Sequence, residues 1–100
     1  MNFVYVLKSQ KTNLLYIGYT TDLKKRFFEH NNSESKYTKH GIPWILIYYE
    51  AYLSNKDARL REKQLKKYKS SYGFLKKKLI NSLQYIEPKK RGEAKIGDKA

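Results

Sequence analysis

The stretch WILIYYEAY, from Trp44 to Tyr52, is almost continuously apolar or aromatic. A strand with one solvated face alternates apolar and polar residues, so an unbroken run of this kind is typical of a strand with both faces at least partly covered. The chain has 100 residues, the size of one small domain of about 100–150 residues. The other elements of this one domain must therefore pack against the strand and form a single modest core with it.

Two shorter stretches near the N-terminus also predict strands. Residues Phe3–Leu7 are β-branched and aromatic, and Leu14–Tyr19 continue in the same way after a polar loop over residues 8–13. A connection this short favours an antiparallel hairpin. We expect Tyr5 and Tyr16 to face each other across it as an aromatic pair.

A helix is predicted directly after the second strand. Thr20 or Thr21 is expected to cap it, with Asp22 in the first turn, where a negative charge suits the helix dipole. Leu23 and Phe27 lie one turn apart and give this helix a face that can join the core.

Two more helices are predicted after the strand at residues 44–52. The sequence SNKD at residues 54–57 resembles a capping box with Asp in place of Glu, which predicts a helix from about Asn55 to Tyr68. The small residues in SSYG, at residues 70–73, are expected to break it. Leucines spaced by four then predict a last amphipathic helix: Leu75, Leu79 and Leu83.

The predicted fold is therefore α+β, with a small three-stranded antiparallel sheet flanked by helices in the order β-β-α-β-α-α. We expect one domain over residues 1–86. Residues 87–100 are charged and contain glycine with a single isoleucine, which is typical of a disordered tail.

The composition excludes several classes of protein. The chain has no cysteine, which removes disulfides, zinc ribbons and thiol nucleophiles and suits a reducing cytoplasm. No apolar stretch approaches the ~20 residues of a membrane span. The first residues, MNFVY, do not combine a basic segment with an apolar one, so we expect no signal peptide and a cytoplasmic protein.

The charge balance indicates the class of partner. There are 22 Lys and Arg residues against 9 Asp and Glu, for a net charge of +13, and residues 87–100 carry only +2 of it. Such an excess on a folded domain favours a polyanion, with nucleic acid first. An anionic membrane surface, the ribosome, or a proteome rich in lysine are the alternatives. The net charge alone does not indicate which reaction the protein catalyses.

Glu62 is the acidic residue that the helical pattern singles out. At about 100° per residue, Ala58, Glu62 and Leu65 fall within one arc of about 60°. Because Ala58 and Leu65 are natural core positions, the Glu62 carboxylate is directed toward the body of the protein. A carboxylate there is costly unless it is paired or coordinates an ion. A salt bridge to a neighbouring lysine, or a tilt toward solvent, is the structural alternative.

Arg26 and His30 form a second candidate group on the first predicted helix. Their i, i+4 spacing puts them on one face. A guanidinium beside an imidazole suits a phosphate clamp, and the imidazole is also able to move a proton. The alternative is a solvated basic face that continues through Lys24 and Lys25.

Gly18 lies inside the second predicted strand. A glycine there loses side-chain packing and commonly marks a bulge or a close approach of the backbone to a ligand. The tyrosines around it, including Tyr16, have an alternative interpretation as ordinary packing residues.

Together these residues make a more specific pattern than any one of them. Phe3-Val4-Tyr5 is followed by Tyr16-Ile17-Gly18, then by Arg26 eight residues past that glycine, by His30 one turn on, and by Glu62. This pattern resembles the GIY-YIG nuclease superfamily, in particular its small stand-alone bacterial members. The segments SKYTK and DARLREKQLKK are similar to those members as well. In the first motif only the tyrosine matches.

The resemblance implies roles for these residues over roughly residues 3–68. Glu62 would hold one divalent metal, Mg²⁺ or Mn²⁺, and Arg26 would neutralise the scissile phosphate. Tyr16 would act as general base or orient the attacking water, with Tyr5 in support, and His30 would assist as a base or phosphate ligand. Since a free tyrosine has a pKa near ~10, Tyr16 needs a nearby cation to act as a base near neutrality.

The resemblance implies a metal-dependent endonuclease that hydrolyses DNA, with structure-led specificity and DNA repair among its roles. The alternative is a nucleic-acid-binding domain of the same fold with little or no turnover. DNA stands ahead of RNA as the partner, and neither a membrane nor an obligate protein partner is indicated. Lysines around the site are expected to hold the phosphate backbone: Lys24, Lys25, Lys36 and Lys66.

Overall fold

The sheet has three strands, and the first strand in the sequence is the central one. In the computed structural model, which describes residues 1–84, β1 (Asn2–Ser9) pairs with both β2 (Leu15–Thr20) and β3 (Trp44–Tyr52). Both pairings are antiparallel, and the strand order is β2-β1-β3. The bounds of β3 are those predicted, and the antiparallel hairpin is confirmed. The predicted tail at residues 87–100 lies outside the described residues.

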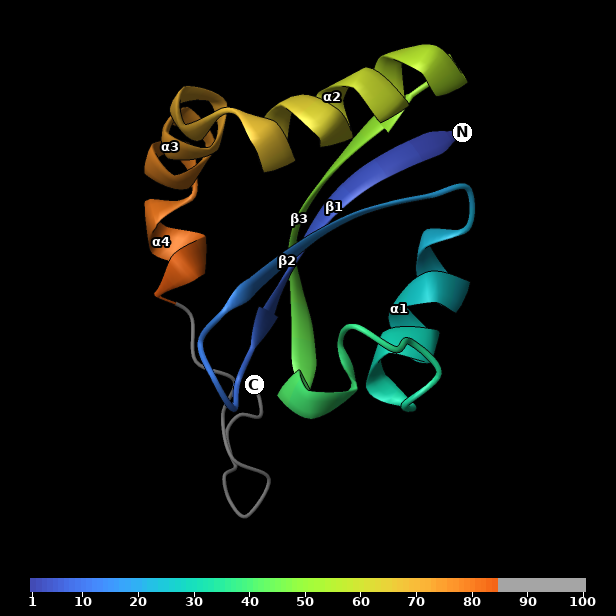
Figure 1. The fold of residues 1–100 in the computed structure, drawn as a ribbon, viewed down its shortest axis with the longest axis vertical. Helices are drawn as coiled ribbons and strands as arrows, with labels where there is room; N and C mark the ends of the chain where they lie inside the picture. Colours follow the sequence, from blue (N-terminus) through green and yellow to red (C-terminus); the bar gives the residue numbers. More distant parts are fainter. Residues whose placement is uncertain (85–100) are drawn as a thin grey trace, which may run out of the picture.

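The helices cover the two faces of the sheet unequally. On one face lie α2 (Asn55–Lys67), α3 (Lys69–Lys78) and the short α4 (Ile80–Leu83), whereas α1 (Leu23–Asn31) lies on the other (Figure 1). A 3₁₀ turn at residues 39–41 precedes β3. The α+β architecture and the predicted order of elements are confirmed.

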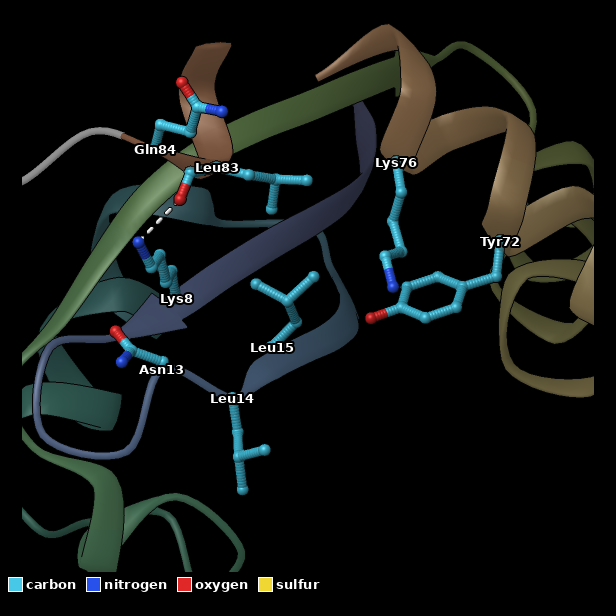
Figure 2. A pocket seen from close by; sticks show the side chains of 8 residues that line it. All are labelled: Lys8, Asn13, Leu14, Leu15, Tyr72, Lys76, Leu83 and Gln84. Atoms are coloured by element: carbon cyan, nitrogen blue, oxygen red, sulfur yellow. Dashed lines mark hydrogen bonds between the residues drawn. The ribbon is translucent and has the colours of Figure 1, made fainter. Parts of the chain in front are cut away.

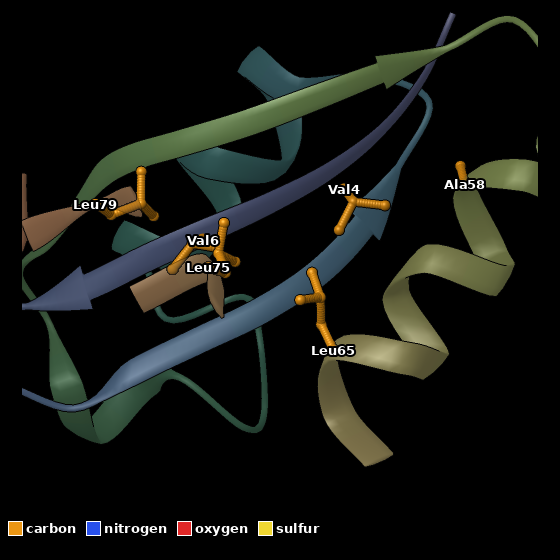
Figure 3. Close-up of a cluster of buried hydrophobic side chains, with 6 residues drawn as sticks. All are labelled: Val4, Val6, Ala58, Leu65, Leu75 and Leu79. Atoms are coloured by element: carbon orange, nitrogen blue, oxygen red, sulfur yellow. The ribbon is translucent and has the colours of Figure 1, made fainter. Parts of the chain in front are cut away.

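Alternation along β1 divides the core into two layers. Val4 and Val6 point toward α2 and α3, and Tyr5 and Leu7 point toward α1. All four side chains are at most 1% exposed, because the central strand is covered on both faces. Figure 3 shows the first layer, whose buried members come from the sheet, α2, α3 and the residue after α3: Val4, Val6, Ala58, Leu65, Leu75 and Leu79.

The second layer holds α1 in place. Leu23 and Phe27 pack against the cluster around Tyr5 and Trp44, as their spacing predicts. At the end of α1, the Asn31 side chain accepts a hydrogen bond from the backbone N–H of Trp44 at 2.7 Å and donates one to its carbonyl at 3.0 Å. The C-terminal end of α1 is thereby fixed to the start of β3.

The cap of α1 differs from the prediction. The Asp22 side chain is the N-cap and accepts a hydrogen bond from the backbone N–H of Lys25 at 3.1 Å. Thr20 is instead the last residue of β2, and its hydroxyl accepts from the backbone N–H of Asp22. A carboxylate is as good a cap as a hydroxyl and also interacts favourably with the helix dipole, so the prediction of a threonine cap is wrong.

The break after α2 also lies elsewhere. The predicted helix from Asn55 is confirmed, but residues 70–73 lie inside α3 and do not interrupt it. The break is at Tyr68, whose backbone is extended with ψ 117°. Two serines are well tolerated in a first turn, and Gly73 costs a helix only about 1 kcal/mol, which packing of Leu75 in the core offsets. The predicted leucine helix is instead split at Leu79 into α3 and α4.

Candidate active site

Gly18 leaves room for a side chain of the protein itself. It lies directly opposite Tyr5 in the ladder between β1 and β2. A Cβ atom on Gly18 would lie 2.5 Å from Tyr5 Cζ and 3.0 Å from Tyr16 Cε2, too close for either ring to stay in place. The β1–β2 register is regular, and the sheet's register shift lies between Val6 and Leu7 on the β3 side. Gly18 therefore does not mark a bulge, which is one of the two interpretations of a glycine in this strand.

Tyr5 and Tyr16 contact each other diagonally. Tyr16 is opposite Leu7, so the two tyrosines are offset along the hairpin and do not face each other directly as predicted. Their ring centroids are 6.3 Å apart and their planes are tilted by 43°. Both rings belong to the layer on the α1 side, and this contact brings Tyr16, on the edge strand, next to the fully buried Tyr5.

His30 is buried between Tyr5 and the loop that follows α1. Its side chain is 0% exposed, its Nε2 is 2.7 Å from the Tyr5 hydroxyl, and its Nδ1 is 2.8 Å from the Thr38 hydroxyl. Burial, together with the nearby Arg26 charge, lowers the pKa of His30 to about 4. The neutral ring has one donor and one acceptor nitrogen, so both are used by these hydroxyls.

The predicted pairing of Arg26 with His30 as a phosphate clamp is not what the geometry favours. With both nitrogens bonded inside the protein, His30 is placed to orient the Tyr5 ring. The ring of His30 also packs against that of Tyr16, with centroids 4.9 Å apart. Burial and the neighbouring Tyr16 raise the pKa of Tyr5 despite the opposing charge of Arg26. Tyr5 therefore stays protonated at neutral pH.

Arg26 is held between α1 and the following loop. Its Nη1 donates to Glu29 Oε1 at 2.9 Å, and its Nη2 donates to the hydroxyl of Ser35 at 3.4 Å. The hydrogen bond that Arg26 donates to Glu29 raises the pKa of Arg26 further, so the guanidinium is always charged. Its charge acts on both Tyr5 and His30, and its side chain is still 31% exposed. The guanidinium is therefore accessible from solvent.

Glu62 reaches the same region from the opposite layer. Ala58 and Leu65 are buried, as predicted, and the Glu62 side chain between them is 18% exposed. Its Oε2 accepts a hydrogen bond from Lys66 Nζ at 2.9 Å, which is the salt bridge foreseen as the alternative. Lys66 Nζ also lies 5.9 Å from the centroid of the Tyr16 ring, and the charge of Glu62 raises the pKa of Tyr5.

The donor set fits a metal ion that keeps most of its water. Within residues 1–84, no group of three His, Cys, Asp or Glu residues is arranged to hold an ion. Mg²⁺ is commonly bound through one or two carboxylates together with water and substrate phosphate. Glu62 offers such a carboxylate, since no residue in the described part of the chain donates a hydrogen bond to its Oε1. A closed, all-protein site for a transition metal does not fit.

Two buried hydroxyls of the site were not singled out from the sequence. Ser35 is 2% exposed and Thr38 is 1% exposed, although both belong to a polar loop. They contact Arg26 and His30 respectively. The signal is the spacing in SKYTK, where two small hydroxyl residues three apart point inward and Lys36 and Tyr37 between them are exposed.

The lysines predicted to bind nucleic acid differ in their surroundings. Lys24, Lys25 and Lys36 are exposed, on α1 and the loop after it. Lys66 is 49% exposed and engaged with Glu62. Three of the four therefore surround the Arg26 side of the site, and the fourth lies inside it.

A pocket of about 640 Å³ lies away from these residues. Figure 2 shows it between the β1–β2 hairpin and α3, with Lys8, Tyr72 and Lys76 among its lining residues. None of the predicted site residues lines it. The candidate site is instead at the edge of the sheet, along β2. Among residues 1–84, no helix is both long enough and apolar enough to span a bilayer.

Comparison with known proteins finds a matching domain family and similar bacterial proteins. The model of the GIY-YIG catalytic domain matches residues 1–78. The UPF0213 protein SpyM50708 of Streptococcus pyogenes serotype M5 (strain Manfredo) is 46% identical over 70 residues, which cover 68% of this chain and 74% of that protein. The UPF0213 protein CPE1444 of Clostridium perfringens (strain 13) is 43% identical over 68 residues, covering 67% and 72%.

A similar solved structure is the solution NMR structure of the UPF0213 protein BH0048 from Bacillus halodurans. It is 29% identical, with a TM-score of 0.49, and the match covers 79% of this chain and 87% of that one. The match to the domain model spans both tyrosine motifs, Arg26 and Glu62. The chain belongs to the GIY-YIG domain family, a superfamily made up generally of nucleases, and its small relatives carry the name UPF0213.

Proposed function

We propose that this protein is a metal-dependent endonuclease that hydrolyses phosphodiester bonds in DNA. The observation that carries the proposal is the meeting of two layers at strand β2. Tyr16 packs against His30 from the α1 layer and lies beside Lys66, which holds Glu62, from the α2 layer. A cation is able to neutralise a phosphate, a phenol to orient or deprotonate water, and a carboxylate to bind a metal ion.

Each residue has a chemical role in this proposal. Arg26 holds the scissile phosphate and neutralises the charge that develops on it. Tyr16 takes the proton of the attacking water or orients that water. Tyr5 and His30 hold the Tyr16 ring in position. Glu62 would bind Mg²⁺, which supplies charge stabilisation at the leaving oxygen.

A nuclease assay tests the proposal. Branched, flapped, single-stranded and duplex DNA, and RNA of matching sequence, are incubated with Mg²⁺ or Mn²⁺. We expect DNA cleavage that falls at least 100-fold in Glu62→Gln and Arg26→Ala. Glu34→Gln, which removes an exposed carboxylate outside the site, is the control and should cleave like the wild type. Cleavage that survives both site substitutions would contradict the residue assignment.

The second candidate function is nucleic-acid binding with little turnover. The salt bridge between Lys66 and Glu62 favours it, because the lysine already occupies one oxygen of the carboxylate. If neither metal supports cleavage while DNA binds, this second function holds. A preference for the RNA substrates would move the proposal from DNA to RNA.

A further inference from the structure

A partly buried acidic residue on β3 is the centre of a hydrogen-bond network that the sequence did not reveal. The Glu50 side chain is 15% exposed and accepts from Arg61 Nε at 2.9 Å and from Arg61 Nη2 at 3.0 Å. The hydroxyls of Tyr48 and Tyr52 each donate to one of its oxygens, at 2.7 and 2.5 Å. Both carboxylate oxygens are thus satisfied, and Arg61 binds in the bidentate geometry that fixes orientation as well as distance.

The roles of donor and acceptor in this network are fixed at neutral pH. Burial alone would raise the pKa of Glu50, but the hydrogen bonds from Arg61, Tyr52 and Tyr48 outweigh it and the pKa is lowered. Burial and the hydrogen bond to Glu50 raise the pKa of Tyr48 and of Tyr52 to about 12. The carboxylate therefore stays charged, and the two phenols stay donors.

The position of Arg61 on α2 relates this network to the candidate site. At about 100° per residue, Arg61 projects about 50° to one side of the line through Ala58 and Leu65, and Glu62 projects about 50° to the other. The structure agrees, since Arg61 reaches β3 while Lys66, on the Glu62 side, lies against Tyr16 of β2.

The β2 side of α2 has a second contact. The guanidinium of Arg59 lies 4.0 Å from the centroid of the Tyr19 ring, a cation–π contact worth about 0.5–2 kcal/mol. The helix is thus held from both flanks, by a partly buried bidentate ion pair with β3 and by cation–π contacts with β2. Of the two, the ion pair tolerates the smaller range of distances and orientations.

We propose that Glu50 is a positioning residue: through Arg61 it fixes the rotation of α2 about its axis and thereby the place of Glu62 at the edge of β2. This proposal rests on the proposed function only for its effect on cleavage. With side chains ending about 5–6 Å from the helix axis, a rotation of about 20° moves the Glu62 carboxylate by about 2 Å. A displacement of this size is enough to reduce catalysis about 100-fold.

Glu50→Gln and Arg61→Lys test the proposal, because both keep the volume of the side chain and lose the bidentate charge pair. We expect the rate of cleavage at saturating DNA to fall 10- to 100-fold and the Mg²⁺ concentration for half-maximal rate to rise, with DNA affinity within twofold of the wild type. Leu75→Val, which weakens the core under α3, is the control for lost stability and should leave both kinetic quantities unchanged in the folded protein.

A measurement that needs neither metal nor activity separates this proposal from the proposed function. Proton–proton NOEs from Arg59 to the Tyr19 ring and from Lys66 to the Tyr16 ring report the rotation of α2. We expect them in the wild type and in Leu75→Val, and we expect them to weaken or vanish in Glu50→Gln. NOEs that are unchanged in Glu50→Gln overturn the positioning role, whether or not the wild type cleaves DNA. Kinetic losses equal to those of Leu75→Val overturn it as well.

Discussion

At the scale of single residues, the site depends on one missing side chain. The Tyr5 ring lies over the position where any other residue at 18 would place its Cβ atom. Gly18 is therefore needed to leave room for Tyr5, which is hydrogen-bonded to His30, which in turn is hydrogen-bonded to Thr38. Gly18 is not needed for a turn, because the pairing of β1 with β2 is regular there.

Gly18→Ala is therefore expected to lower the free energy of unfolding by about 1–3 kcal/mol, since Tyr5 has no space to move within the core. Gly73→Ala is the matched control: a Cβ there meets nothing within 4 Å, and alanine is the better helix former by about 1 kcal/mol. Urea unfolding of the three proteins measures the difference. Equal stability of the two variants would contradict the steric argument.

His30 makes the stability depend on pH. Its pKa is about 4 in the folded protein against an ordinary 6.5. Above pH 6.5 the ring is neutral in both states and the stability is complete. As the pH falls from 6.5 to 4, the unfolded chain binds a proton that the folded protein does not, so the free energy of unfolding falls by about 2–3 kcal/mol. His30→Gln should lose this part of the pH dependence when the free energy of unfolding is measured by urea titration at several pH values. If the free energies of His30→Gln and the wild type changed in parallel with pH, the assignment to His30 would be contradicted.

At the scale of elements, the loop between α1 and β3 acts as part of the site. Thr38 binds His30 through its side chain and accepts a hydrogen bond from Trp44 Nε1 through its carbonyl at 2.7 Å, and Ser35 binds Arg26. The loop is therefore fixed from the inside at Ser35 and Thr38, although most of its residues are polar.

Thr38→Val should lower the free energy of unfolding by about 1–3 kcal/mol, because it leaves Nδ1 of the buried His30 without a partner while keeping the volume of the side chain. Thr21→Val, at an exposed position, should change it by less than about 0.5 kcal/mol. Thermal or urea unfolding distinguishes them. A loss as small as that of the control would show that His30 needs no partner at Nδ1.

The regular elements were the part that the sequence could predict. Period-two and 3.6-residue patterns depend on neighbouring residues alone, so β3 and the inward side of Glu62 on α2 followed from them. The burial of His30 and the network of Glu50 did not, because each depends on a partner from a different element. A carboxylate inside an otherwise apolar strand was the available sign for Glu50.

At the scale of the whole molecule, the site lies where the two layers meet along β2. Arg26 belongs to α1 and Glu62 to α2, and these two helices cover opposite faces of the sheet (Figure 1). Of the four lysines predicted to bind nucleic acid, Lys24, Lys25 and Lys36 lie on α1 and the loop after it, so we expect the polyanion to approach from α1; exposed lysines also lie on α2 and α3.

The salt dependence of DNA binding tests this direction of approach. Replacing Lys24 or Lys25 by Ala should weaken binding for all sequences and reduce the slope of log K against log salt by about 1. Lys11→Ala, in the exposed β1–β2 loop, should leave the slope unchanged. Binding isotherms between 50 and 200 mM salt measure it, and equal slopes for all variants would place the DNA elsewhere.

The order of the strands has a consequence for the chain during its synthesis. The ribosome makes β1 first, yet β1 is the middle of the sheet, so one of its edges stays unpaired until β3 has emerged. The carboxylate of Glu62 emerges later still. A nascent chain that pauses before α2 carries the phosphate-binding part of the proposed site without its metal-binding part. Under the proposed function, we expect such a chain to bind a nucleic acid without cutting it.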